Sequence, residues 1–201
     1  MAIADAYSTA AAYRAVTGRT DTSADADILT DLTAISRYIE GKLMRFFNKD
    51  AADVIRVYVP AQNSRAIWID DLSAAPATVK LDSAGDNTFA TTLAATDYEL
   101  LPLNADKGPE PRPYTRIRMT DWGDYSYFTK SERVQITGKW GWPAVPTAIA
   151  RATIHLTAIL RLETPRATVR IPELSDAIEA SPEAQHIIKQ LMDQYYRPRY
   201  V

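Results

Sequence analysis

The stretch from residue 136 to 163, ITGKWGWPAVPTAIARATIHLTAILRLE, constrains the fold of this chain more than any other. It starts as a strand, breaks at Gly138 and turns a corner that holds two tryptophans and two prolines. After Pro146 comes the most apolar run of the chain, and proline suits a first helical turn because its φ is already right and its missing N–H costs nothing. Apolar residues occupy nearly every side of the expected 146–163 helix. Such a helix is normally buried on most sides, in its own core or against another subunit.

The composition is that of an ordinary globular protein. The chain has 201 residues, of which 46% are hydrophobic and 24% charged, so it can bury a core. A net charge of −2 argues against a surface that binds nucleic acid by neutralising phosphates, although DNA could still slide past it. Cysteine is absent from the sequence, which excludes disulfides, thiolate chemistry and cysteine zinc sites. We expect a soluble intracellular protein, since neither a signal-peptide pattern nor a membrane-spanning run is evident.

Two helices are predicted near the N-terminus. Ser8 is a candidate cap for a short helix that ends at Gly18. Four aspartates between positions 21 and 31 crowd the start of the second helix, residues 24–47, where carboxylates meet free N–H groups and the positive end of the helix dipole. The apolar stripe of this second helix repeats every three or four residues. It comprises Ile28, Leu32, Ile35, Ile39, Leu43 and Phe46.

Between the helical blocks the apolar period changes to two. Ile55, Val57 and Val59 alternate with Val54, Arg56 and Tyr58, as in a half-buried strand. Further short strands are expected around Ile67 and Ile69, Val79 and Leu81, Tyr98 and Leu100, Ile117 and Met119, and Val134 and Ile136. Residues 102–113 hold four prolines and predict a long exposed loop.

These patterns predict an α+β fold in one domain, residues 1–201. We expect a small helical bundle framework from residues 1–50 and 139–201, completed by a C-terminal helix that starts at Ser181-Pro182-Glu183. An antiparallel β-rich region, residues 53–138, would be inserted into this framework.

Residues that could carry catalysis are sparse. His155 and His186 have no ligand or general-base partner at a useful spacing. Asp70 and Asp71 would point to opposite sides of a strand, so a strand end is favoured over a metal or acid–base pair. Gly138-Lys139 lacks the upstream glycine and the following Ser or Thr of a phosphate-binding loop. We therefore predict no catalytic residue, no cofactor, no metal site and no enzymatic activity.

Aromatic and arginine side chains favour interfaces instead. The tryptophans at 68, 122, 140 and 142 could form a stacking face, but few Lys or Arg residues lie beside them, so core or subunit packing is favoured. The tail after residue 194 carries the Tyr and Arg side chains that are enriched at interface hot spots, with a frayed terminus as the alternative. The predicted subunit or portal interface residues are Trp140, Trp142, Arg151, His155, Tyr195, Tyr196, Arg197, Arg199 and Tyr200.

Three segments resemble the head–tail adaptor (connector) proteins of long-tailed bacteriophages. They are SRYIE with RFF at the end of the second helix, YELLPLN at 98–104, and the stretch from 138 to 162 with its Gly-Lys-Trp-Gly-Trp-Pro corner. They occur in the family's order and, with the last helix, cover most of the chain. The β-rich region exceeds the helical minimum of the family, and this is where the sequence departs from it.

The resemblance implies a structural virion protein at the neck between head and tail, made in the host bacterial cytoplasm. Proteins of this kind form a ring, commonly of twelve subunits, beneath the portal, where they extend the DNA channel. The implied partners are other copies of the chain, the portal protein and the next neck, stopper or tail protein; DNA would pass through without specific binding, and a membrane would play no part. Three other interpretations stay open: a stopper or tail terminator, a small hydrolase, and a carbohydrate-binding module that uses the tryptophans.

Overall fold

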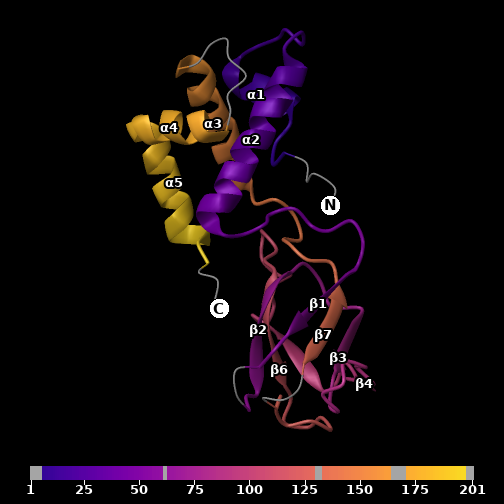
Figure 1. Cartoon of the computed structure of the whole chain (residues 1–201). Coiled ribbons are helices and arrows are strands. Elements are labelled where there is room, and N and C mark those ends of the chain that lie inside the picture. The colour runs from indigo at the N-terminus through magenta and orange to yellow at the C-terminus, as the bar shows by residue number, and fades with distance from the viewer. Residues whose placement is uncertain (1–5, 61–62, 130–132, 164–170, 198–201) are drawn as a thin grey trace. The chain divides into compact units, whose positions relative to one another are not determined.

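The computed structural model describes residues 6–60, 63–129, 133–163 and 171–197 (Figure 1). Helices and two antiparallel sheets confirm the predicted α+β class. The chain divides into two compact units: a helical unit, residues 1–48 and 145–201, and a β unit, residues 49–144. The helices are α1 (Ala10–Thr17), α2 (Asp25–Leu43), α3 (Thr147–Glu163), α4 (Ile171–Ala180) and α5 (Pro182–Tyr195).

The predicted apolar stripe of α2 forms the centre of the helical unit. Its members from Ile28 to Leu43 are at most 1% exposed. The helix ends earlier than predicted, because Met44 adopts a left-handed φ of 54°. Phe46 therefore leaves the stripe and is 50% exposed, while Phe47 is fully buried in its place.

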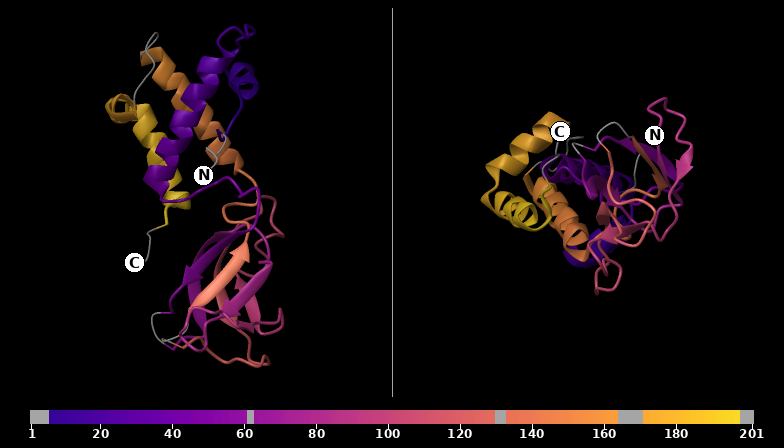
Figure 2. Two further views of the ribbon diagram at one scale, coloured as in Figure 1. Left: turned by 45° about the vertical axis from the view of Figure 1, so that its right-hand side comes forward. Right: turned by 90° about the horizontal axis from the view of Figure 1, so that it is seen from below.

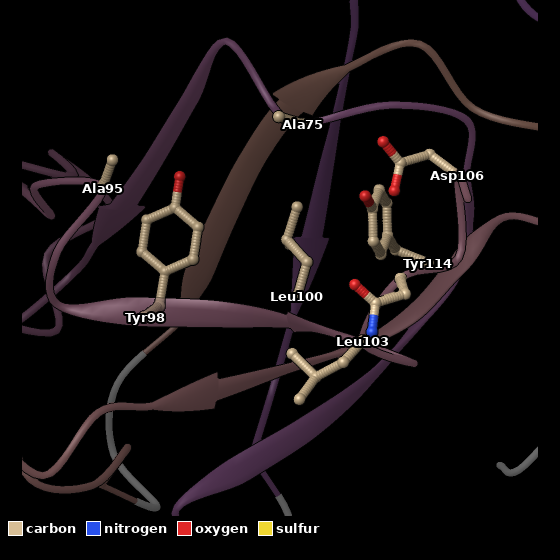
Figure 3. A pocket seen from close by; sticks show the side chains of 8 residues that line it. Ala75, Ala95, Tyr98, Leu100, Leu103, Asp106 and Tyr114 are labelled. Carbon is tan, nitrogen blue, oxygen red and sulfur yellow. The ribbon is translucent and has the colours of Figure 1, made fainter.

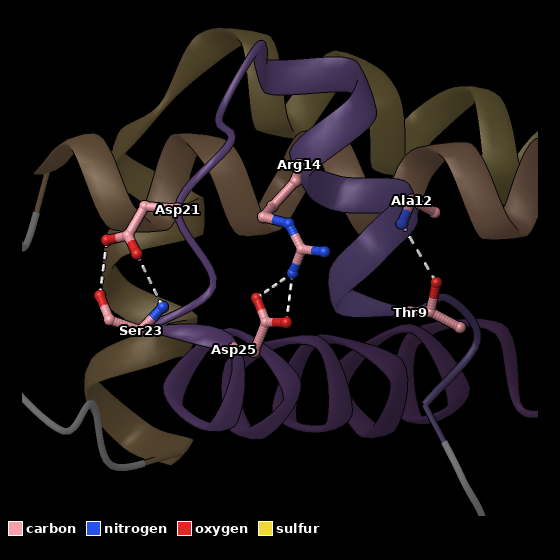
Figure 4. A network of polar contacts seen from close by, with 6 residues as sticks. All are labelled: Thr9, Ala12, Arg14, Asp21, Ser23 and Asp25. Atoms are coloured by element: carbon pink, nitrogen blue, oxygen red, sulfur yellow. Dashed lines mark hydrogen bonds and ion pairs between the residues drawn. The ribbon is translucent and has the colours of Figure 1, made fainter.

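Polar contacts fix α1 against the start of α2 (Figure 4). Thr9, and not Ser8, caps α1, since its side chain accepts a hydrogen bond of 3.1 Å from the N–H of Ala12. Arg14 of α1 forms an ion pair with Asp25 in the first turn of α2. The predicted end at Gly18 is confirmed by its left-handed φ of 70°.

Helix α3 lies beside α2 in Figures 1 and 2 and begins one residue later than predicted. The carbonyl of Pro146 accepts a hydrogen bond of 3.0 Å from the N–H of Ala150, so the proline precedes the first turn. Arg161 at the other end of α3 pairs with Asp31 of α2. The buried side of α3 consists of Ile149, Ala152, Thr153, Ile154, Leu156, Thr157 and Leu160.

The β unit is a sandwich with one core between its two sheets. One sheet has the order β1-β7-β3-β4 and the other β2-β6-β5, and every pair is antiparallel. The core takes Ile67 and Ile117 from one sheet and Val79 and Ile136 from the other. The strands are β1 (Val54–Tyr58), β2 (Ala66–Leu72), β3 (Thr78–Leu81), β4 (Thr91–Thr92), β5 (Tyr98–Leu101), β6 (Tyr114–Met119) and β7 (Val134–Gly138).

Strand β1 turns its apolar side to solvent. Ile55, Val57 and Val59 are 57%, 48% and 68% exposed, whereas Arg56 and Tyr58 are half-buried. Tyr58 packs against the sandwich core, and its hydroxyl donates a hydrogen bond of 3.0 Å to Asp70 of β2. The predicted alternation is present, but its burial is the reverse of the usual one.

Candidate functional site

Asp70 and His186, which by residue type are candidates for chemistry, each lie beside another polar side chain. Among the described residues, no three of His, Cys, Asp or Glu gather where they could bind a metal ion. Asp70 forms an ion pair of 2.6 Å with Arg56. His186 lies 3.0 Å from the side-chain amide of Gln190. No helix within the described ranges is both long and apolar enough to cross a membrane.

Trp140, a predicted interface residue, is built into the β unit. Its ring is 2% exposed, and its Nε1–H donates a hydrogen bond of 2.8 Å to the carbonyl of Val54. The guanidinium of Arg56 lies 4.6 Å from the ring centroid. Trp142 is 4% exposed. Both rings are thus buried within one chain, and a role for them in a subunit or portal interface stays a prediction.

The C-terminal residues that the structure describes are held against the end of α2. Tyr195 is 5% exposed and packs edge-on against Phe47, with ring centroids 5.6 Å apart. The N–H of Arg197 donates to the carbonyl of Leu43 at 3.4 Å. Tyr196 is 47% exposed. Tyr195 thus packs inside the helical unit, and its role in an interface stays a prediction. Arg199 and Tyr200 lie outside the described residues.

Arg151 and His155 form an accessible pair on α3. Both side chains are exposed and lie one helical turn apart, so they share a face. Arg151, His155 and Tyr196 are therefore the predicted interface residues whose side chains are exposed. Their role in an interface stays a prediction.

A buried polar cluster fixes the first described residues onto α2. The Tyr7 hydroxyl donates to the carboxylate of Glu40, and Arg37 lies 2.9 Å from the same carboxylate. Burial raises the pKa of Glu40 above its usual range, and the hydrogen bond from Tyr7 opposes that rise. Burial and the neighbouring Glu40 also raise the pKa of Tyr7. These buried contacts hold the segment around Tyr7 in place against α2.

Two apolar surfaces of the β unit were missed from the sequence. The first is the β1 stripe, defined as Ile55, Val57 and Val59. The second is a pocket of about 380 Å³ at β5, called the β5 pocket (Figure 3). A period of two shows that a strand has two different sides, but it does not show which side the second sheet covers. The β5 pocket is lined by Ala75, Ala95, Tyr98, Leu100, Leu103, Asn104, Asp106 and Tyr114.

Comparisons with known proteins agree on one architecture. No family model matches the chain, and no curated protein matches it. A chain described as the neck of an empty GTA particle computed with C6 symmetry matches with a TM-score of 0.54 and 18% identity, over 96% of this chain and 90% of that chain. A chain from the neck of a native GTA particle computed with C12 symmetry matches with a TM-score of 0.53 and 19% identity, over 95% and 89% of the two chains. The shared property is the fold.

A third match extends the same likeness. A chain from the virion of a native gene transfer agent (GTA) particle has a TM-score of 0.51 and 19% identity, over 96% of this chain and 90% of that chain. Because these matches span nearly the whole chain, the helical unit and the β unit both belong to the shared architecture.

Proposed function

We propose that this chain is a structural neck protein of a phage-like particle, and within the neck a head–tail adaptor. It would form a ring of twelve subunits between portal and tail, and extend the DNA channel without acting as an enzyme. The observation that carries the proposal is the fold shared with neck chains of GTA particles over 95–96% of this chain. The sequence segments that resemble phage adaptors support it independently.

The surface of a single chain also supports assembly into a ring. Large apolar side chains are exposed in both units, for instance Leu162 of α3 at 80% and Trp122 at 77%. Single exposed apolar residues are ordinary, but neighbouring ones such as Ile55, Val57 and Val59 favour contact with other proteins. The net charge of −2 suits a channel through which DNA moves without being held.

In this proposal residues 1–201 act as one adaptor domain, with a framework of 1–50 and 139–201 and an insertion of 53–138. The exposed α3 pair, Arg151 and His155, would contact a neighbouring copy. The tail from Tyr196 onward would dock on the portal. The loop of residues 102–114 would reach a neighbouring copy or the next neck protein.

The direct test is to add the purified chain to portal-bearing heads that lack it and to image the vertex by electron microscopy. We expect ring-shaped density on the portal, with twelve-fold symmetry, and no binding to heads without portals. Binding to isolated tail tubes in place of portals would favour a stopper or tail terminator. Binding to neither would overturn the proposal.

A second test concerns the tail. Deleting residues 196–201 should weaken binding to isolated portal rings while α5 stays folded, because α5 ends at Tyr195. The matched control is Lys189→Ala, an exposed substitution on α5 that should leave binding unchanged. Equal binding by the deletion variant and the full chain would exclude the tail as the portal contact.

A further inference from the structure

Strand β1 is an open sheet edge that carries exposed apolar side chains. It occupies one end of the order β1-β7-β3-β4, and within the described residues it pairs with β7 alone. Soluble proteins usually protect such edges with charged side chains or proline. Here the charged residue of the strand, Arg56, is half-buried and pairs with Asp70, while the β1 stripe faces outward. An edge built in this way indicates a surface that a partner covers.

The β5 pocket lies on a different edge of the same sandwich. Strand β1 lies beside β2, because Asp70 of β2 binds both Arg56 and Tyr58 of β1. Strand β5 occupies the far end of the order β2-β6-β5. The β1 stripe and the β5 pocket therefore lie at opposite edges of the unit.

The pocket is an uncovered part of the sandwich core. Tyr98 and Leu100 pair with Met119 and Ile117, which are both fully buried, so they take inward-facing positions. Both side chains nonetheless remain half-buried. Figure 3 shows the Tyr98 ring and the Leu100 side chain extending from β5 into the pocket, with Leu103 beside them. The exposed fraction of Leu103 is 59%. The pocket thus offers apolar surface that the chain itself does not cover.

Resting on the proposed ring, we propose that the β1 stripe of one copy packs into the β5 pocket of the next copy. A contact between two different surfaces of identical chains is heterologous, and repeated head to tail it forms a ring when the rotation between copies closes and an open filament when it does not. Such a contact requires two different surfaces on one unit, and the two apolar surfaces described above lie at opposite edges of the β unit. A contact of β1 with β1 would instead be isologous and stop at a dimer.

The charges of the two surfaces agree with this pairing. The β1 stripe is uncharged, and so are its partners on β7, Gln135 and Thr137, while Lys80 lies one strand farther on, opposite Gln135. Asp106 is the ionisable carboxylate that lines the pocket, and Lys107 already pairs with it at 2.9 Å. Joining the surfaces therefore buries apolar area without stranding an unpaired charge, which would be costly.

The absence of cysteine from the chain permits a clean cross-linking test. The variant Val57→Cys/Leu103→Cys, assembled on portal-bearing heads and oxidised, should give a ladder of covalent oligomers that ends at the ring size. Each single variant should stay monomeric under denaturing, non-reducing conditions. The matched control is Ser126→Cys/Leu103→Cys, which places an exposed cysteine elsewhere in the β unit and should give no ladder. Both target side chains are exposed, so the variants should fold.

The outcomes separate this inference from the proposed function. Rings without a ladder would overturn the stripe-to-pocket contact and leave the neck function standing. Dimers from Val57→Cys alone would show an isologous β1 contact, and cross-links from position 57 to the portal or another neck protein would show a different occupant; each overturns the inference. Absence of any ring on the heads would overturn both proposals.

A charge exchange gives a second readout. Val57→Glu and Leu103→Lys should each abolish rings, because each buries a lone charge. A mixture of the two variants should recover rings of alternating subunits, since the Val57→Glu stripe meets the Leu103→Lys pocket with opposite charge and the other contact is unchanged. One chain with both substitutions should recover rings. Rings from either single variant would contradict the proposed contact.

Discussion

The hydroxyl of Tyr7 donates a hydrogen bond to the carboxylate of Glu40 and accepts one of 3.0 Å from the backbone N–H of Phe47. The backbone N–H of Tyr7 also donates to the hydroxyl of Ser36 at 3.0 Å. Through its hydroxyl and its backbone N–H, Tyr7 thus ties together two turns of α2 and the segment that follows it. All of these groups are buried, so their loss cannot be compensated by water without rearrangement.

Tyr7→Phe should lower the free energy of unfolding by about 1–3 kcal/mol, because it removes the buried hydrogen bonds that the Tyr7 hydroxyl makes with the N–H of Phe47 and the carboxylate of Glu40. Urea unfolding followed by helical circular dichroism measures the change. The matched control is Tyr13→Phe, because Tyr13 is also buried but its hydroxyl makes no hydrogen bond within the described part of the chain. The control should change stability by about 0.5 kcal/mol or less. Equal losses in the two variants would contradict a special role for Tyr7.

Glu40 should make stability fall as the pH rises through the acid range. Because burial raises the pKa of Glu40, the folded chain holds this proton more tightly than the unfolded chain. The stabilising contribution is fully present below the unfolded pKa and is lost as the pH rises through the folded pKa. Glu40→Gln removes this loss, so its stability relative to the unmodified chain should increase from about pH 4 to pH 7.

Asp21→Asn provides a control of opposite sign for that pH profile. Hydrogen bonds from the side chain and backbone of Ser23 lower the pKa of Asp21. Its contribution is therefore present at neutral pH and lost as the pH falls through the folded pKa. Thermal unfolding between about pH 3 and pH 7 measures both variants. Parallel profiles for the two would contradict the assignment.

Trp140→Phe should destabilise the β unit by about 1–3 kcal/mol, through the lost hydrogen bond to the Val54 carbonyl and the space left by the smaller ring. Trp122→Phe is the matched control, since Trp122 is 77% exposed. We expect this control to unfold within about 0.5 kcal/mol of the unmodified chain. Denaturant unfolding read from the remaining tryptophans separates the two. A stable Trp140→Phe variant would be inconsistent with the packing described above.

Two glycines should respond in opposite ways to alanine. Nothing lies within 4 Å of a Cβ at Gly41, which is in α2, so Gly41→Ala should stabilise the chain. The gain should be about 0.5–1 kcal/mol, the difference in helix propensity. At Gly123 a Cβ would lie 2.7 Å from the backbone Cα of Asp97, so Gly123→Ala should cost about 1–3 kcal/mol. Melting temperatures that shift the same way would contradict this.

The sequence predicted the helices and strands better than it predicted which residues pack against them. The stripe of α2 was readable because apolar side chains at spacings of three and four have only one common side. The alternation of β1 predicted a strand. It could not predict the contacts of Arg56 with Trp140 and of Tyr58 with Asp70, because these partners lie far away in the sequence. Local periodicity carries no information about such partners.

The interface residues were harder to predict for a related reason. Large aromatic residues dominate both cores and interfaces, so composition does not separate the two. Trp140 and Tyr195 lie in the interior of their units, whereas Arg151 and His155 on α3 are exposed. Only the three-dimensional structure distinguishes a tryptophan that is buried within its own chain from one that is exposed and able to contact another protein.

The β unit begins and ends on neighbouring strands, since Val54 of β1 is paired with Gly138 of β7. Paired residues of antiparallel strands have Cα atoms about 4.5–5.5 Å apart, so the chain leaves the unit almost where it came in. A segment with adjoining ends can be lengthened, shortened or replaced without rerouting the polypeptide on either side, as in tolerated domain insertions. The β unit could in this sense be exchanged as a whole while the helical unit stays the same.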